Sequence, residues 1–219
     1  MESAEKILSA ELQKIGFAKQ KNKFFIKTDD MIFLIAFEKP SELLYLQFAL
    51  IPLFVPCPGH IYYTYGNRLN NIFSDFPVFH VMSTESQLKA ECDVAIQRIR
   101  ENILPFTERI SSAEKLCDVL FDRLKRKDKI FSKYIFCDPV NLLRLQLYVC
   151  LYTENYGKCR LFASQYVEAI KGNQTYSRQL TEKKIAEIEQ VTTDINEKKY
   201  DEINSMLRNN IRENLELFS

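Results

Sequence analysis

The residues best suited to chemistry lie in one short stretch, ALIPLFVPCPGHIYYTYGNRL, at positions 49–69. Cys57 and His60 could act as a nucleophile and its base, because a cysteine must give up its proton before it attacks. Such an enzyme would also need Arg68 to converge on the pair. Cys57 stands between two prolines, with no helix start beside it to activate the thiol. The pattern favours an ordinary loop cysteine with a hydrogen-bonded histidine, and we assign no catalytic residue.

The same stretch carries residue types that are common at protein interfaces. Its three prolines remove backbone donors, so the segment must lie at a sheet edge or leave the sheet. Tyrosine and arginine contribute large contact areas and directed hydrogen bonds, and both are enriched at interface hot spots. The commoner role of such tyrosines is to pack the N-terminal sheet on the helical half; an exposed surface at the sheet edge is the alternative, and it is our preferred functional site. The candidate interaction residues are His60, Tyr62, Tyr63, Tyr65 and Arg68.

Two basic runs offer a second kind of surface. Residues 19–27 carry four lysines, and residues 123–133 carry six positive charges against one aspartate. Basic residues with nearby aromatics can hold a phosphate backbone and stack bases, although a solvated helix end and linker is the commoner meaning. The formal net charge of +1 argues against a dedicated nucleic-acid binder. The candidate polyanion-binding residues are Lys19, Lys21, Lys23, Arg123, Lys125, Arg126 and Lys127.

Several common chemistries are excluded by what the sequence lacks. Its five glycines do not have the spacing of a dinucleotide- or phosphate-binding loop, so we expect no cofactor. The six cysteines are dispersed without a C-x-x-C pair, and no Cys/His cluster offers ligands to a metal. The first residues lack the apolar core of a secretory signal, and no apolar run approaches the ~20 residues of a membrane span. We therefore expect a cytoplasmic protein with reduced cysteines and no membrane partner.

Residues 1–108 have the pattern of an α+β domain. An amphipathic helix precedes Gly16, and Thr28–Asp30 reads as a hairpin turn between two apolar strands. Thr84 and Gln87 form a capping box that starts a second helix, which we expect Pro105 to end. The expected strands are 24–27, 31–37, 43–55, 60–65 and 77–82.

Residues 109–219 have the pattern of a helical domain. Ser111 and Glu114 suggest another capping box, and Asp138 before Pro139 starts a helix that is apolar on most sides. Two helical hairpins follow, with Tyr156 and Tyr200 just after their turns, 44 positions apart. This spacing resembles helix-pair repeats but exceeds the 34-residue tetratricopeptide period. A solenoid-like arrangement and a plain helical bundle both stay open.

Strands followed by helices predict an α+β fold, with an N-terminal antiparallel sheet, flanking helices and an all-α C-terminal bundle of helical hairpins. LQKIGFAKQKNKFFIKTDDMIFLIAFEKP, residues 12–40, resembles the opening of a bacterial domain-of-unknown-function family, number 4304. The matching elements are Gly16-Phe17, the lysine-rich link, Phe24-Phe25, Asp29-Asp30 and Glu38-Lys39, with Glu38 where that family has glutamine. The resemblance implies an α+β N-terminal domain from a bacterium or phage, and no activity.

Three function classes remain. We favour a non-catalytic protein-interaction module of the immunity or adaptor kind, which fits the missing catalytic constellation and the balanced charge. The alternative is a nucleic-acid-associated protein that binds through the basic runs, and the third class is an enzyme with no recognisable motif. Another protein is the expected partner, and the sequence does not set the oligomeric state.

Overall fold

The predicted α+β fold is confirmed by the computed structural model, which describes residues 3–56, 64–80, 83–126 and 130–218; the side chains of 122–130 are also left undescribed. The sheet is antiparallel throughout, with strand order β1-β2-β3-β4-β5, and β6 pairs with β4 at a separate place. The strands are β1 (Ala18–Gln20), β2 (Lys23–Lys27), β3 (Met31–Glu38), β4 (Leu43–Pro52), β5 (Gly66–Arg68) and β6 (Phe79–His80).

The central hairpins follow the hydrophobic pattern of the sequence. Strands β3 and β4 pair from Met31↔Pro52 to Glu38↔Tyr45, and almost every residue of β3 is buried. The turn at Thr28–Asp30 does more than reverse the chain, because the Asp30 carboxylate accepts hydrogen bonds from the Ala113 amide at 2.9 Å and the Tyr152 hydroxyl at 2.8 Å. This turn therefore joins the sheet to the helices that follow it.

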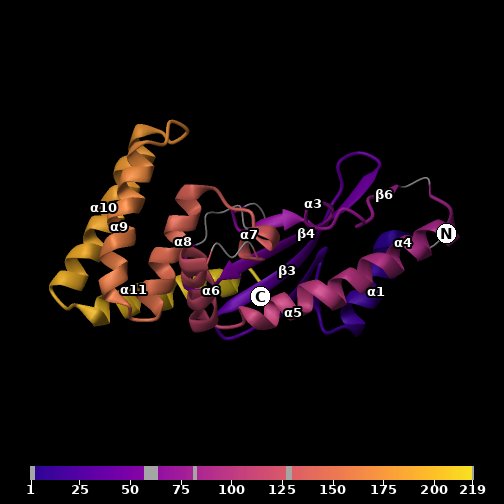
Figure 1. The fold of residues 1–219 in the computed structure, drawn as a ribbon, viewed down its shortest axis with the longest axis horizontal. Helices are drawn as coiled ribbons and strands as arrows, with labels where there is room; N and C mark the ends of the chain where they lie inside the picture. Colours follow the sequence, from indigo (N-terminus) through magenta and orange to yellow (C-terminus); the bar gives the residue numbers. More distant parts are fainter. Residues whose placement is uncertain (1–2, 57–63, 81–82, 127–129, 219) are drawn as a thin grey trace.

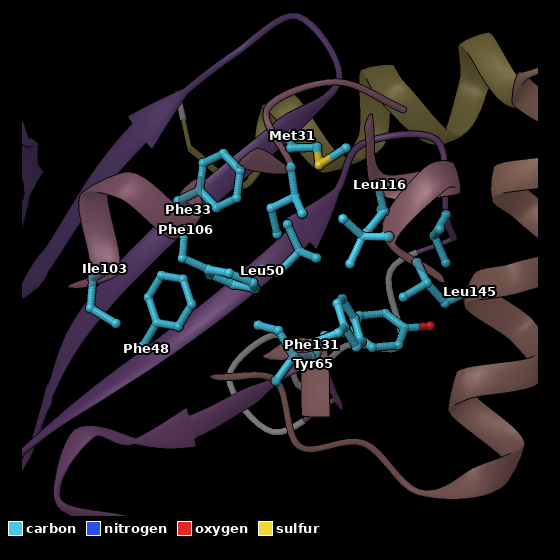
Figure 2. Packing of buried hydrophobic residues seen from close by; sticks show 14 of the residues in the cluster. Met31, Phe33, Phe48, Leu50, Tyr65, Ile103, Phe106, Leu116, Phe131 and Leu145 are labelled. Atoms are coloured by element: carbon cyan, nitrogen blue, oxygen red, sulfur yellow. The ribbon is translucent and has the colours of Figure 1, made fainter. Parts of the chain in front are cut away.

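One face of the sheet is covered by helices from the first half of the chain. The helices α1 (Ala4–Lys14) and α4 (Glu85–Arg98) lie along it, and their apolar side chains join the core cluster of the sheet. Figure 2 shows Phe33 and Phe48 from the sheet facing Phe106 in this layer. Gly16 ends α1 with φ +99°, and the Thr84–Gln87 capping box starts α4, as the sequence predicts.

The expectation that Pro105 ends this helix is wrong. The chain continues from α4 through a π-helical segment, η1 (Ile99–Ile103), into α5 (Leu104–Arg109) without leaving helical dihedrals. The π-helical segment changes the backbone hydrogen-bond register just before Pro105. Pro105 therefore stands in the first turn of α5, where a proline, which has no N–H, removes no intrahelical hydrogen bond. The helix therefore runs on to Arg109.

The predicted strand at 60–65 is wrong in its described residues, and the predicted strand at 77–82 is present only in part. Residues 60–63, 81 and 82 lie outside the described residues; Thr64 and Tyr65 are not in a strand, and β5 begins at Gly66. Of the second segment, only Phe79 and His80 form a strand. The pairings that the described residues do make on β4 are short: β5 spans Gly66–Arg68 and β6 spans Phe79–His80.

The second half of the chain is helical, as expected. The helices are α6 (Ala113–Arg126), α7 (Ile130–Tyr134), α8 (Pro139–Tyr152), α9 (Tyr156–Lys171), α10 (Arg178–Asn196) and α11 (Tyr200–Glu216), and a four-residue helix, α3 (Leu69–Ile72), follows β5. Asp138 caps α8 before Pro139, as predicted, by accepting from the Asn141 amide at 2.9 Å. The predicted capping box at Ser111 is off by one residue, because it is the Ser112 hydroxyl that accepts from the Lys115 amide.

The helical half packs on both faces of the sheet. Helix α8 is central, with every residue from Arg144 to Leu151 buried, and it belongs to the same core cluster as the sheet and α4. Helix α11 runs back to the sheet and covers its second face with Ile211 and Leu215, and Phe218, just after the helix, packs there too. In Figure 1, α9 and α10 lie at the end of the molecule away from the N-terminus. Within the described residues, no helix is both long and apolar enough to cross a membrane.

Hairpins α8–α9 and α10–α11 repeat one geometry 44 residues apart. In the first turn, the Asn155 amide donates to the Cys150 carbonyl at 2.8 Å, and Glu154 has φ 55°. In the second, the Lys199 amide donates to the Asp194 carbonyl at 2.8 Å, and Lys198 has φ 58°. Both are Schellman turns, in which a left-handed residue lets the chain reverse after the helix.

The two hairpins also contact each other through Tyr156 and Tyr200, which occupy equivalent positions in the repeat. The rings of Tyr156 and Tyr200 stack with their centroids 4.6 Å apart and their planes 15° from parallel. The Arg160 guanidinium in α9 donates to the Asn196 side chain at the second turn, at 3.0 Å. The described helices thus contain a two-unit helix-pair repeat, which favours the solenoid-like alternative over an irregular bundle.

Candidate functional site

Just after β4, four consecutive backbone carbonyls accept hydrogen bonds from side chains of the helical half. After Pro52 the chain leaves the sheet, and proline at positions 52 and 56 prevents a regular ladder, so these carbonyls need other partners. Helices α8 and α11 supply them through three buried side chains. Asn214 donates to the Leu53 and Val55 carbonyls at 2.7 and 2.8 Å, Asn210 to the Phe54 carbonyl at 3.0 Å, and Arg144 to the Pro56 carbonyl at 2.8 Å.

Arg144 is the unusual member of this set, because it is a full positive charge inside the protein. It lies on α8 with 8% of its surface exposed, and an arginine stays protonated at any physiological pH. Its hydrogen bond to Pro56 uses one of the five guanidinium N–H groups. Among the described residues, no carboxylate oxygen lies within 4 Å of its nitrogens. A buried cation without an ion-pair partner is rare in protein interiors.

Three tyrosines lie within electrostatic range of this guanidinium. Tyr148 follows Arg144 by one turn of α8, Tyr166 comes from α9, and Tyr65 comes from the residue before β5. Burial raises the pKa of the Tyr148 and Tyr166 hydroxyls to about 12 and also raises the pKa of Tyr65, while Arg144 acts in the opposite direction on all three. The hydroxyls therefore stay protonated at neutral pH and are hydrogen-bond donors.

A second cation lies at the edge of the group. Lys184 on α10 is half-buried, with its ammonium 5.5 Å from the centre of the Tyr176 ring. Burial lowers the pKa of Lys184, the positive charge of Arg144 lowers it further, and Glu187 acts to raise it. We refer to Arg144, Tyr148, Tyr166 and Lys184 as the Arg144 cluster. Its members come from α8, α9 and α10 and interact electrostatically with Arg144, and the carboxylate of Glu187 on α10 acts on all four of them.

Of the predicted interaction residues, the structure describes Tyr65 and Arg68. For Tyr65 the packing interpretation is confirmed and the exposed surface is wrong, because Tyr65 is 3% exposed and its hydroxyl donates to the Asn141 carbonyl at 3.2 Å. Figure 2 shows it packed beside Phe131 in the core. The tyrosine before β5 faces inward because β5 places it over the helical half rather than toward solvent. His60, Tyr62 and Tyr63 lie outside the described residues, as does Cys57.

Arg68 lies on the sheet, away from Tyr65, and has partners of its own. Its guanidinium makes two hydrogen bonds to the Glu38 carboxylate, at 2.8 and 2.7 Å, and lies 4.3 Å from the centre of the Tyr45 ring. This arrangement pairs the arginine with a carboxylate across β3, β4 and β5, and the pair is partly exposed. Tyr65 and Arg68 therefore do not form one surface.

The lysines of the first basic run are divided between the two faces of the sheet. Lys19 lies over the Phe24 ring on the face that packs on α1, whereas Lys23 lies over the Phe218 ring on the opposite face. Lys21 occupies the turn between them with φ 55°. Strand geometry explains the division, because successive residues alternate between faces. In the second run, the backbones of Arg123, Lys125 and Arg126 lie in α6 with undescribed side chains, and Lys127 lies outside the described residues.

The described cysteines and acidic residues do not add a second site. Cys92, Cys117, Cys137, Cys150 and Cys159 are free thiols. Burial raises the pKa of the Cys92 thiol to about 12, so it stays unreactive at neutral pH. Within the described part of the chain, no group of three or more histidine, cysteine, aspartate or glutamate side chains is arranged to hold a metal ion.

Sequence reasoning missed the Arg144 cluster because its members lie in helices that read as structural. The available signal was a single arginine inside VNLLRLQLYVCLY, the most apolar helix of the chain. An arginine at such a position must be buried, and a buried charge is a candidate functional group. The two tyrosines and the lysine come from α8, α9 and α10, which no local pattern brings together.

Comparison of the chain with protein-family models, with curated proteins and with solved structures finds no match. The resemblance of residues 12–40 to family 4304 therefore stays a prediction, as does a bacterial or phage origin. The case for a function depends on the chain's own residues.

Proposed function

We propose that the chain is a non-catalytic protein-interaction module of the immunity or adaptor kind, and that hairpins α8–α9 and α10–α11 carry its partner-binding surface. The observation behind this proposal is the two-unit repeat, with matching Schellman turns and the stacked pair Tyr156–Tyr200. Stacked helix pairs form extended surfaces that are widely used to bind other proteins.

The outer surface of the repeat has the character that such binding needs. Leu161 on α9 is 54% exposed, and its neighbours Lys158 and Arg160 are exposed cationic residues. An exposed apolar residue near polar, charged ones is a common arrangement at interfaces between proteins. Helices α9 and α10 lie away from the N-terminal end (Figure 1). A partner on α9 would therefore not need to displace α1 or α4.

The test compares three forms of the intact protein as affinity baits in lysate of the source organism. The baits are the natural chain, Leu161→Glu on α9, and Val94→Glu on α4, which is a matched control because Val94 is 39% exposed on the opposite half. Each capture is repeated with nuclease and read by mass spectrometry. We expect a stoichiometric protein that survives nuclease, is retained by Val94→Glu and is lost with Leu161→Glu.

Two results would overturn the proposal. Retention of every captured protein by Leu161→Glu would remove the α9 surface from the interaction. Loss of all partners on nuclease digestion, with a steep decrease in binding as salt is added, would instead support the nucleic-acid alternative and the basic runs at 19–27 and 123–133.

A further inference from the structure

A cavity of about 410 Å³ lies at the end of the sheet where α1 and α4 both begin. The two helices run parallel. Near their starts the Cys92 thiol donates to the Ala4 carbonyl at 4.0 Å, and further along the Arg100 guanidinium lies 3.9 Å from the Glu11 carboxylate. Their first turns therefore lie side by side, toward the N-terminal end in Figure 1, and the β3–β4 turn and β6 complete the wall of the cavity.

The floor of this cavity is apolar and reaches the core. Leu44 of β4 and Phe79 of β6 are paired across the two strands, and both are buried. Ala4 of α1 and Leu88 of α4 also line the cavity and belong to the same core cluster. Protein interiors are closely packed and contain few voids larger than a water molecule. A cavity of this volume therefore has room for a ligand, and it falls in the range of ~300–1,000 Å³ that is typical of small-molecule sites.

The wall of the cavity carries polar side chains that the fold does not use. Within the described part of the chain, the side chains of Ser3, Ser41, Ser83 and His80 line the cavity and have no hydrogen-bond partner. A serine hydroxyl can donate and accept, and a neutral imidazole does both through its two nitrogens. A few polar groups beside an apolar floor are the arrangement that orients a bound small molecule.

The full charges at the cavity cancel. Lys39 from the β3–β4 turn and Glu5 from the first turn of α1 both line it, and their ammonium and carboxylate lie 2.7 Å apart. Because this ion pair has no net charge, a charged ligand would gain little attraction there while it lost the hydration of its own charge. An uncharged ligand leaves the ion pair intact, so the lining favours a neutral molecule.

We propose that this cavity binds an uncharged amphipathic small molecule. Its apolar body lies against Leu44, Phe79 and Leu88, and its hydroxyl, carbonyl or amide group forms hydrogen bonds with the serine hydroxyls and His80. The site is separate from the interaction surface on α9, because every residue of its lining belongs to the N-terminal half of the chain. The protein can therefore bind a partner and a small molecule at once.

The test titrates the intact, ¹⁵N-labelled protein with straight-chain primary alcohols from butan-1-ol to heptan-1-ol and follows the amide chemical shifts by NMR. We expect saturable shifts confined to residues around the cavity. The apparent affinity should rise about threefold to fourfold for each added CH₂ until the chain fills the cavity. Hexanoate and hexylammonium should each bind several-fold more weakly than hexan-1-ol. Tighter binding of either ion would overturn the assignment of a neutral ligand.

Two variants fill the cavity from different walls. Ser83→Phe and Leu43→Trp replace partly exposed lining residues, so if one variant fails to fold the other still decides the matter. Each should lower the apparent affinity for hexan-1-ol by about tenfold or more, because the added ring occupies the space of the ligand. Ser86→Phe is the matched control, since Ser86 is exposed in the first turn of α4 and does not line the cavity, and it should bind as the natural chain does. Shifts that stay linear with alcohol concentration, or an unchanged affinity in a folded Ser83→Phe or Leu43→Trp variant, overturn the proposal.

Discussion

Hairpins α8–α9 and α10–α11 share a backbone but almost no sequence. Their turns have the same pair of Schellman hydrogen bonds and the same left-handed residue, 44 positions apart. In the aligned segments, CLYTENYGKCRLFASQYVEAIK and DINEKKYDEINSMLRNNIRENL, the shared residue beside the turn is the tyrosine at 156 and 200. A repeat of this kind is therefore preserved by turn geometry and by packing against its neighbour, rather than by side-chain identity.

The difference between the hairpins lies in their surroundings. Helix α8 is enclosed by the sheet, α6, α9 and α11, so its residues are apolar on nearly every side. Helix α10 packs on α9 and α11 and presents its other side to solvent, so it alternates charged and apolar residues. Position in the molecule therefore determines the composition of each helix, while the turn determines its direction.

The contrast between the enclosed α8 and the partly exposed α10 is tested most strongly by truncating the side chain at one position of α8 and at its equivalent in α10. Leu145 in α8 is fully buried, and its equivalent in α10 is the exposed Glu189. Leu145→Ala should lower the free energy of unfolding by about 2–5 kcal/mol, whereas Glu189→Ala should change it by less than ~0.5 kcal/mol. Urea unfolding of both variants measures the difference. Similar losses would show that α10 is enclosed as α8 is, and that the contrast between the hairpins is false.

Much of the fold was accessible from the sequence because its signals are local. Gly16, the Thr84–Gln87 box and Asp138-Pro139 each specify a helix end through backbone groups a few residues away, and the structure confirms all three. The prediction that Pro105 ends the helix was wrong because a π-helical segment precedes it, so that Pro105 stands in the first turn of α5, where proline is tolerated. Local chemistry predicts where a helix can end, whereas tertiary packing decides whether it does.

The candidate site was less accessible, because it depends on contacts that are distant in the chain. The stretch at 49–69 was correctly singled out as unable to form a continuous strand, and its end at Pro56 meets Arg144. Nothing near position 56 in the sequence points to a partner 88 residues later. Tyr65 was a candidate interface residue because tyrosine is enriched at hot spots; its burial depends on a contact with Asn141, 76 residues later in the chain.

A second prediction concerns pH and the tyrosine of α8, whose equivalent in α10 is Thr192. Burial raises the pKa of Tyr148 to about 12 in the folded protein, against 10.0 for an ordinary tyrosine. The stabilisation from the neutral hydroxyl is complete below pH 10 and is lost as pH rises toward 12. By pH 11 the natural chain should lose about 1.4 kcal/mol more, relative to pH 9, than Tyr148→Phe.

Urea unfolding at pH 9 and pH 11 measures this difference, and Thr192→Val is the control because it alters the equivalent position without removing an ionisable group. That control should follow the natural chain at both pH values. An identical pH dependence for Tyr148→Phe and the natural chain would mean that the hydroxyl is not desolvated, and the enclosure of α8 would need revision.

A smaller effect tests whether the hairpins are energetically coupled. The stacked rings of Tyr156 and Tyr200 should contribute about 0.5–1.5 kcal/mol beyond their separate burial. A double-mutant cycle with Tyr156→Leu and Tyr200→Leu measures this coupling through unfolding free energies. A second cycle, pairing Tyr156→Leu with Val94→Ala on α4, should show none. Coupling in neither cycle would reduce the repeat to two hairpins that merely lie side by side.

The smallest effect asks whether the two turns are equivalent in energy as well as in shape. Glu154 and Lys198 each hold a left-handed conformation that glycine adopts without steric cost, at φ 55° and 58°. Glu154→Gly and Lys198→Gly should each raise the free energy of unfolding by about 0.5–1 kcal/mol, the relief of strain being partly offset by the greater freedom of glycine when unfolded. Alanine at either position keeps the Cβ atom and should give no gain. Because the turns have the same hydrogen bonds, the two increases in the free energy of unfolding should agree. An increase at one turn alone would mean that packing around the hairpins, rather than the Schellman geometry, determines their stability.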